Sequence, residues 1–158
     1  MNKIEAPYIN IFPTTWKNPT ETAFPLPIGI QEDNSYTLTI GKEKNLNFMV
    51  SNTTLGLIQC TLQVDGVDVP LSKSPPYSFL LAEREAEKVP PIVISVMQRF
   101  VENHRILTIQ TTERTYPLPV EHNPVLFQFE TQEMTKKNDV VRPIGTRAAI
   151  TQILCTFE

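Results

Sequence analysis

Apolar and polar residues alternate most regularly along residues 57–64, which read L-I-Q-C-T-L-Q-V. A period of two is typical of a β-strand with one face against a core and the other in water. The Asp65-Gly66 pair that follows favours a tight hairpin turn, because glycine adopts positive φ angles without steric cost. Residues 67–71 alternate again as V-D-V-P-L, so we predict that they return along the first strand.

The same alternation recurs along most of the chain and predicts an all-β fold. Many short alternating strands separated by turn signals are typical of an antiparallel β-sandwich. We expect the strands at 92–96 and 106–111 to pair across Glu102-Asn103-His104. Residues 82–88 are predicted as a solvated helical loop, and the polar residues 131–144 as an exposed loop. The further predicted strands lie at residues 36–40, 46–50, 77–79, 125–129 and 153–157.

The apolar positions of these strands define a predicted core. A chain of 158 residues is long enough to form one domain around such a core. The predicted core residues are Leu38, Phe48, Val50, Cys60, Leu62, Val67, Phe79, Leu107 and Ile109.

Three short motifs resemble the bacterial immunoglobulin-like (Ig-like) modules. They are V-D-G-V-D-V at 64–69, S-P-P-Y-S-F at 74–79 and H-R-I-L-T-I-Q-T-T at 104–112, and the resemblance covers about residues 37–112. It implies an Ig-like sandwich and a role in adhesion or carbohydrate binding outside the cell. The chain departs from the family in its longer segment between Phe79 and His104, and in lacking the glycine that usually precedes the H-T-L-T strand.

The first 34 residues combine five prolines with several large apolar side chains. Proline keeps a segment extended and suits sheet edges rather than interior strands. We therefore predict an extended arm at 1–34, a sandwich at 35–121, and C-terminal strands at 122–158 that complete or extend it. The arm could cover its own sandwich or lie on a neighbouring subunit, and we favour the neighbour. Its candidate partner-binding residues are Tyr8, Ile11, Phe12, Trp16, Phe24 and Ile28.

Charge and hydropathy narrow the classes of partner. The net charge of −3 argues against a protein that binds nucleic acid, which would need a basic stripe. No run of about 18 apolar residues predicts a membrane span. The first residues, M-N-K-I-E-A-P-Y, lack the apolar region of a signal peptide. We therefore expect a component of a virus particle that is made in the host cytoplasm without a signal peptide, with the cytoplasm itself as the alternative location.

No group of residues predicts catalysis, a cofactor or a metal site. His104 and His122 lie in different segments, and Asp65 and Asp68 suit a hairpin turn better than a calcium site. Cys60 lies at an apolar position in its strand, where burial would raise its pKa and leave the thiol inert. We expect a protein that is not an enzyme.

The favoured function is a structural subunit of a large assembly, most plausibly a minor capsid, decoration or tail component of a virus or phage particle. Its partners would be other protein subunits, with a homo-oligomer as a further option, and neither nucleic acid nor a membrane. Strand edges and exchanged arms are common means of holding such assemblies together. The alternative is an adhesion or carbohydrate-binding module, for which Tyr8, Trp16 and Tyr116 are the candidate sugar-stacking residues.

Overall fold

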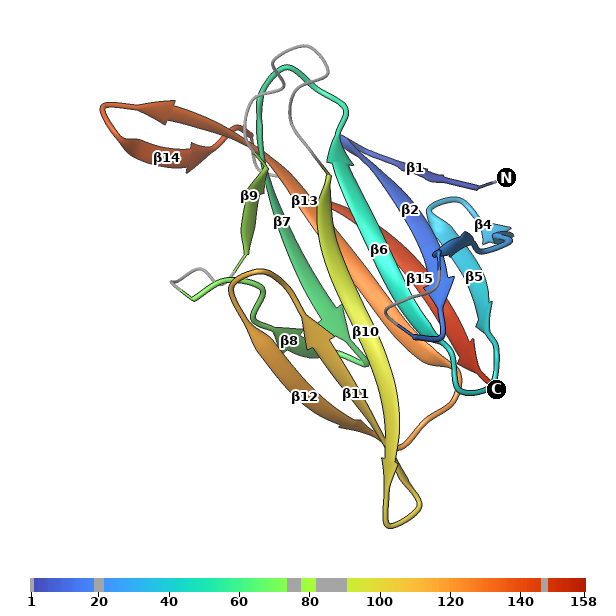
Figure 1. Cartoon of the computed structure of the whole chain (residues 1–158). Helices are drawn as coiled ribbons and strands as arrows, with labels where there is room; N and C mark the ends of the chain where they lie inside the picture. The colour runs from blue at the N-terminus through green and yellow to red at the C-terminus, as the bar shows by residue number, and fades with distance from the viewer. Residues whose placement is uncertain (1, 19–21, 74–77, 82–90, 146–147) are drawn as a thin grey trace.

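The computed structural model describes residues 2–18, 22–73, 78–81, 91–145 and 148–158. These residues form fifteen strands and no helix, arranged in two sheets (Figure 1). The prediction of an all-β sandwich is confirmed. The predicted helical loop at 82–88 and the predicted strand residue Tyr77 lie outside the described residues.

The first sheet, sheet A, runs in the order β1-β2-β6-β10-β11-β12, with β3 paired to the outer side of β2. All its strand pairs are antiparallel. The strands are β1 (Ile4–Ala6), β2 (Ile9–Trp16), β3 (Phe24–Pro25), β6 (Asn45–Asn52), β10 (Ile92–Val101), β11 (His104–Gln110) and β12 (Thr115–Val120).

The second sheet, sheet B, runs in the order β4-β5-β15-β13-β7-β8, with β9 paired to β7 and β14 paired to β13. Only the β5–β15 pair is parallel among the pairs of the described strands. The strands are β4 (Gly29–Glu32), β5 (Ser35–Ile40), β7 (Leu57–Val64), β8 (Val67–Val69), β9 (Phe79–Leu81), β13 (Val125–Lys137), β14 (Val140–Pro143) and β15 (Ala149–Phe157). The C-terminal strands β13 and β15 thus complete the middle of this sheet.

The core fills the space between the two sheets. In β7 every second side chain is buried, as the alternation predicts. The Phe48 ring lies 5.4 Å from that of Phe127 and 5.2 Å from that of Phe129, so that sheet A and sheet B meet at an aromatic cluster. Eight of the nine predicted core residues are buried. Val67 was wrongly included: it is 42% exposed, because it follows the turn on a short edge strand with no further strand to cover it.

The predicted arm at 1–34 is wrong for residues 4–16, which belong to the sandwich, and also for β3 and β4, which join the two sheets, and for Leu26, which is buried in the core. Strand β2 pairs with β6 over eight residues, and Ile4, Ile9 and Ile11 are fully buried in the common core. Pro13 is tolerated inside β2 because its carbonyl accepts a 3.0 Å hydrogen bond from Leu26 N–H on the outer side of the strand. Since N and C=O of one residue point to the same side of a strand, the missing N–H of Pro13 faces away from β6.

The predicted loop at 131–144 is also wrong, because β13 continues to Lys137 and turns back as β14. Asn138 and Asp139 form the turn, with φ angles of 53° and 61°. Positive φ at both central residues is the signature of a tight hairpin turn. This two-stranded ribbon projects from the body of the sandwich (Figure 1). Its end is solvated on both faces, so no apolar alternation could indicate a strand.

The other predicted turns are confirmed. Asp65 and Gly66 have φ angles of 49° and 79°, and Glu102 and Asn103 have φ angles of 50° and 67°. The Asp65 carboxylate also accepts a 2.8 Å hydrogen bond from the backbone N–H of Leu126, which joins this turn to the start of β13.

The strand order bears on the Ig-like resemblance, which stays a prediction. The neighbours β7, β13 and β15 have the relation of strands C, F and G in an Ig sandwich. On sheet A, however, the first strand that follows β7, β8 and β9 in the chain is β10, which lies beside β6. Strands β11 and β12 then follow in order toward the edge of the sheet. In the Ig order the edge strand D precedes strand E, which lies beside B.

Candidate interaction surface

The outer face of sheet A carries almost no charge. Side chains of β2, β6, β10, β11 and β12 that alternate with the buried positions point outward, and among them only Arg99 is a charged residue, with His104 taken as neutral. Charged residues make up 20% of the whole chain. Depletion of charge is typical of the centre of a protein–protein interface. Face A is defined here by its six large apolar residues: Phe12, Trp16, Met49, Val93, Met97 and Ile106.

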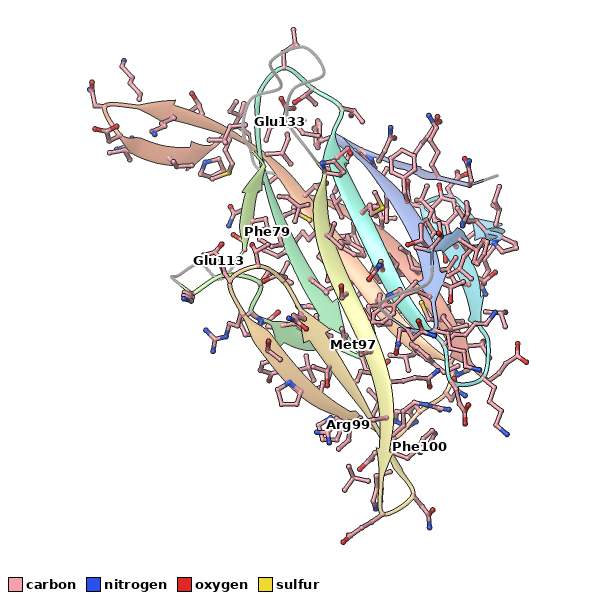
Figure 2. All side chains as sticks on the ribbon, in the orientation of Figure 1. Phe79, Met97, Arg99, Phe100, Glu113 and Glu133 are labelled. Carbon is pink, nitrogen blue, oxygen red and sulfur yellow. The ribbon has the colours of Figure 1, made fainter. Side chains whose placement is uncertain are left out.

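The strand register brings three of these apolar side chains together. Phe12 lies opposite Met49, and Met49 lies opposite Val93, so one row crosses three strands. Side chains directly opposite on neighbouring antiparallel strands have Cβ atoms about 4.5–5.5 Å apart. Val93 is 40% exposed, and the other two are half-buried. Met97 lies further along β10 (Figure 2). Aromatic residues and methionine are enriched in interfaces.

Two polar groups of β2 lie among these apolar residues. The indole Nε1 of Trp16 donates a 3.0 Å hydrogen bond to Oδ1 of Asn47, which fixes the indole across the neighbouring strand. The hydroxyl oxygen of Thr14 is buried and has no hydrogen-bond partner among the described residues. A buried polar group without a partner costs about 1–3 kcal/mol. Face A is therefore a mixed surface of apolar and uncharged polar side chains, and the Thr14 hydroxyl is buried in it without a partner among the described residues.

The structure separates the six residues that were predicted to bind a partner. Ile11 is fully buried and Ile28 packs against the core, so the prediction is wrong for Ile11. Phe12 and Trp16 both point outward from β2 and lie on face A. Phe24 is 62% exposed on β3 beside β2. The sequence prediction missed four residues of face A, because each lies on the side of its strand that also carries polar residues: Met49, Val93, Met97 and Ile106.

Tyr8 has a different role, because it joins the β1–β2 turn to sheet B. Its φ angle of 72° is unusual for a large side chain. The carbonyl of Pro7 accepts a 3.1 Å hydrogen bond from the Thr131 hydroxyl, and the carbonyl of Tyr8 accepts one of 2.9 Å from Thr53 N–H. A hydrogen bond to the Glu133 carboxylate raises the pKa of the Tyr8 hydroxyl. These bonds hold an uncommon backbone conformation in place.

The outer face of sheet B carries both polar and apolar side chains, since Leu126 lies opposite Leu154 and Ile150 is 50% exposed. Gln63, Gln128 and Gln152 lie opposite one another on three neighbouring strands. The Gln63 amide also donates a 2.8 Å hydrogen bond to Asp68 on β8. This row of glutamines is readily hydrated and gains little from being covered by a protein partner. Face A differs in its outward aromatic and methionine side chains, which are enriched in interfaces, so it is the better candidate for protein contact.

The residues considered for chemistry lie apart. Cys60 and Cys155 are free and fully buried, and burial raises the pKa of Cys60 to about 12 and that of Cys155 further still. A thiol with a raised pKa is a poor nucleophile. His104 and His122 are exposed in different segments. Within the described residues no group of three or more His, Cys, Asp or Glu residues could hold a metal ion.

The three candidate sugar-stacking residues are not brought together. Tyr8 precedes β2 and Trp16 ends it, and eight residues of strand span about 27 Å. Tyr116 lies on β12 and packs partly against the core. These three side chains do not make one platform.

No protein-family model, no curated protein and no solved structure matches this chain. The described part of the chain contains no helix that is long and apolar enough to span a bilayer.

Proposed function

We propose that the chain is a structural subunit of a large assembly, a minor capsid, decoration or tail component of a virus or phage particle, and that it has no enzymatic role. Face A is the observation that carries this proposal. It combines Phe12 and Trp16 of β2 with two methionines and two β-branched residues, and Arg99 is the one charged residue among the outward positions of β2, β6, β10, β11 and β12. Removing the apolar part of such a surface from water favours association by about 25 cal/mol for each Å², which must exceed the entropy lost on binding.

The edges of sheet A support contact through its face rather than through its strands. The edge strand β12 contains Pro117 and Pro119, which have no backbone N–H to donate to a further strand. At the opposite edge, β1 and β3 are only three and two residues long. Short edges and prolines discourage the addition of a strand from another chain. A partner of sheet A would therefore dock on face A.

The test is whether a charge in the middle of face A removes the chain from its assembly. We expect the wild-type chain to co-sediment with large particles from the cells that produce it. Val93→Lys should stay at low molecular mass while it keeps its melting temperature, because a buried unpaired charge is costly at an interface. Thr156→Lys, on the exposed outer side of β15, is the matched control and should still co-sediment.

Two outcomes would contradict the proposal. A wild-type chain that never sediments with particles would show that it is no structural subunit. Undiminished incorporation of folded Val93→Lys would show that face A is not the surface of contact.

A further inference from the structure

The ribbon formed by the end of β13 and by β14 projects beyond the body of the sandwich (Figure 1). Among the described strands, β14 pairs with β13 alone. The side chains of residues 135–140 are all exposed. A two-stranded ribbon on its own is only marginally stable in water, and it becomes stable when another surface packs against it. The ribbon is therefore a candidate for an element that is covered in the assembly.

The strand register places an apolar residue beside two cations on one face of the ribbon. Lys137 lies opposite Val140, and Thr135 lies opposite Arg142. Residues directly opposite on antiparallel strands point to the same side, and so does every second residue along a strand. These four side chains therefore share one face, and all of them are exposed, Val140 by 47%. We call them the ribbon face.

The ribbon is rich in cations, although the chain as a whole is acidic. Residues 134–143 contain three cations and one carboxylate, whereas the net charge of the chain is −3. Lys136 lies 4.0 Å from the carboxylate of Asp139. Lys137 and Arg142 form no ion pair with a carboxylate of the described residues. A surface that fits the ribbon face therefore combines carboxylates with a small apolar area.

A hollow of about 370 Å³ lies between the edge strands β1 and β4, on the opposite side of the molecule from the ribbon (Figure 1). Ile30 of β4 and Tyr36 of β5 lie opposite each other and form one wall, and residues from the start of the chain form the other. Ile30 is 64% exposed, so this wall presents an apolar group to water. A cavity of about 150 Å³ is enough to hold benzene, so the hollow is large enough for a valine side chain and the stem of a neighbouring lysine.

Among the described residues, carboxylates outnumber cations around this hollow. Glu5 lines it and lies 3.4 Å from the ammonium of Lys3. Glu32 and Asp33 follow Ile30 in the chain, at the β4–β5 turn, and both are exposed. Neither forms an ion pair with a cation of the described residues. Three residues of extended chain span about 10 Å, which is close to the Debye length of about 10 Å at 0.1 M salt, so both carboxylates attract a cation near Ile30.

We propose that the ribbon of one copy of the chain docks in the hollow between β1 and β4 of a second copy. Val140 covers the exposed side of Ile30. Lys137 and Arg142 then lie beside the carboxylates of the β4–β5 turn. A second copy is the fitting partner because the chain itself carries both surfaces, three cations with one carboxylate on the ribbon and three carboxylates with one cation around the hollow. Opposite charges of this kind orient two proteins as they approach.

The contact runs head to tail, because the two surfaces that meet are different. Each molecule has one ribbon and one hollow on opposite sides, so a pair of molecules still has one of each to offer (Figure 1). A contact of this type gives a ring if the rotation between copies closes, and an open chain if it does not. The inference rests on the proposed role in an assembly and adds to it a way for copies to join, on a surface separate from face A.

The test is sedimentation of the purified full-length chain at rising concentration, up to about 0.5 mM. We expect the average mass to rise with concentration at about 0.1 M salt. It should fall back toward that of a monomer at about 1 M salt, where the Debye length is only about 3 Å. Val93→Lys should associate as the wild type does, because face A takes no part in this contact.

Two variants that each keep one surface intact give the sharper test. Arg142→Glu alters the ribbon face and Ile30→Lys alters the hollow, and both positions are exposed, so each variant should keep its melting temperature. Each variant alone should associate at least about tenfold more weakly than the wild type. An equimolar mixture should form a 1:1 dimer and nothing larger, because the intact ribbon of one variant docks in the intact hollow of the other. Lys73→Glu reverses a charge on an exposed loop residue outside both surfaces and is the matched control.

The proposal is overturned if the wild type stays monomeric over the whole concentration range. It is equally overturned if the mixture of Arg142→Glu and Ile30→Lys stays monomeric, or if Lys73→Glu weakens association as much as Arg142→Glu. None of these results depends on face A, so a failure here leaves the structural role to be judged on co-sedimentation with particles.

Discussion

Replacing Ile11 by alanine tests whether the N-terminal segment belongs to the core. Ile11 is fully buried on β2, where it lies between Ile4 on β1 and Val50 on β6. Removing three carbons from a buried isoleucine costs about 2–5 kcal/mol, of which part is lost transfer energy and part is the cavity. For a domain of this size, that loss lowers the melting temperature by roughly 4–20 °C.

The measurement is urea unfolding, followed both by circular dichroism and by the fluorescence of Trp16, the single tryptophan of the chain. Agreement between the two probes shows that unfolding is two-state. The matched control is Phe12→Ala, one residue further along and on the outward side of the strand, which should cost about 1 kcal/mol or less. A loss below about 1 kcal/mol for Ile11→Ala would refute the placement of β2 in the core. Deletion of residues 1–16 should leave no folded protein.

Leu62→Ala should lower the free energy of unfolding by about 2–5 kcal/mol, because it leaves a cavity. Val67→Ala at the exposed turn should change it by less than about 1 kcal/mol. Equal losses for the two variants would show that the core residues are wrongly assigned. Cys60 and Cys155 should not react with Ellman's reagent at pH 8 until urea unfolds the chain, and rapid labelling of the native protein would contradict their burial. Because the pKa of Tyr8 is raised in the folded state, its contribution to stability is present below the ordinary tyrosine pKa of about 10 and is lost as the pH rises above it. Tyr8→Phe should therefore show a smaller fall in melting temperature between pH 9 and pH 11 than the wild type, and identical falls would argue against the hydrogen bond to the β13 carboxylate.

Strands with one buried face and one solvent-exposed face were predictable from the sequence. In β6 and β7 the burial of alternate residues follows the sequence pattern directly. The N-terminal strand was missed because Pro13 was taken as a sign against a paired strand. Whether a paired strand tolerates a proline depends on which side of the strand the missing N–H would face. That side becomes known only once the neighbouring strands are placed.

The candidate surface could be predicted only in part. Phe12 and Trp16 are large apolar residues in a polar context, and the sequence alone marks them. Met49 and Val93 become neighbours of Phe12 through the pairing of three strands that are distant in the sequence.

The parallel pairing of β5 with β15 has a consequence for synthesis of the chain. Leu38 lies beside Cys155, so the middle of sheet B cannot form until residues 149–157 have left the ribosome. Until then β5 and β13 each expose an unpaired edge, and contacts between residues so far apart in sequence form slowly. A chain truncated before β15 would therefore be an aggregation-prone intermediate rather than a smaller domain. Newly made protein would depend on rapid completion of the chain or on a chaperone to avoid aggregation.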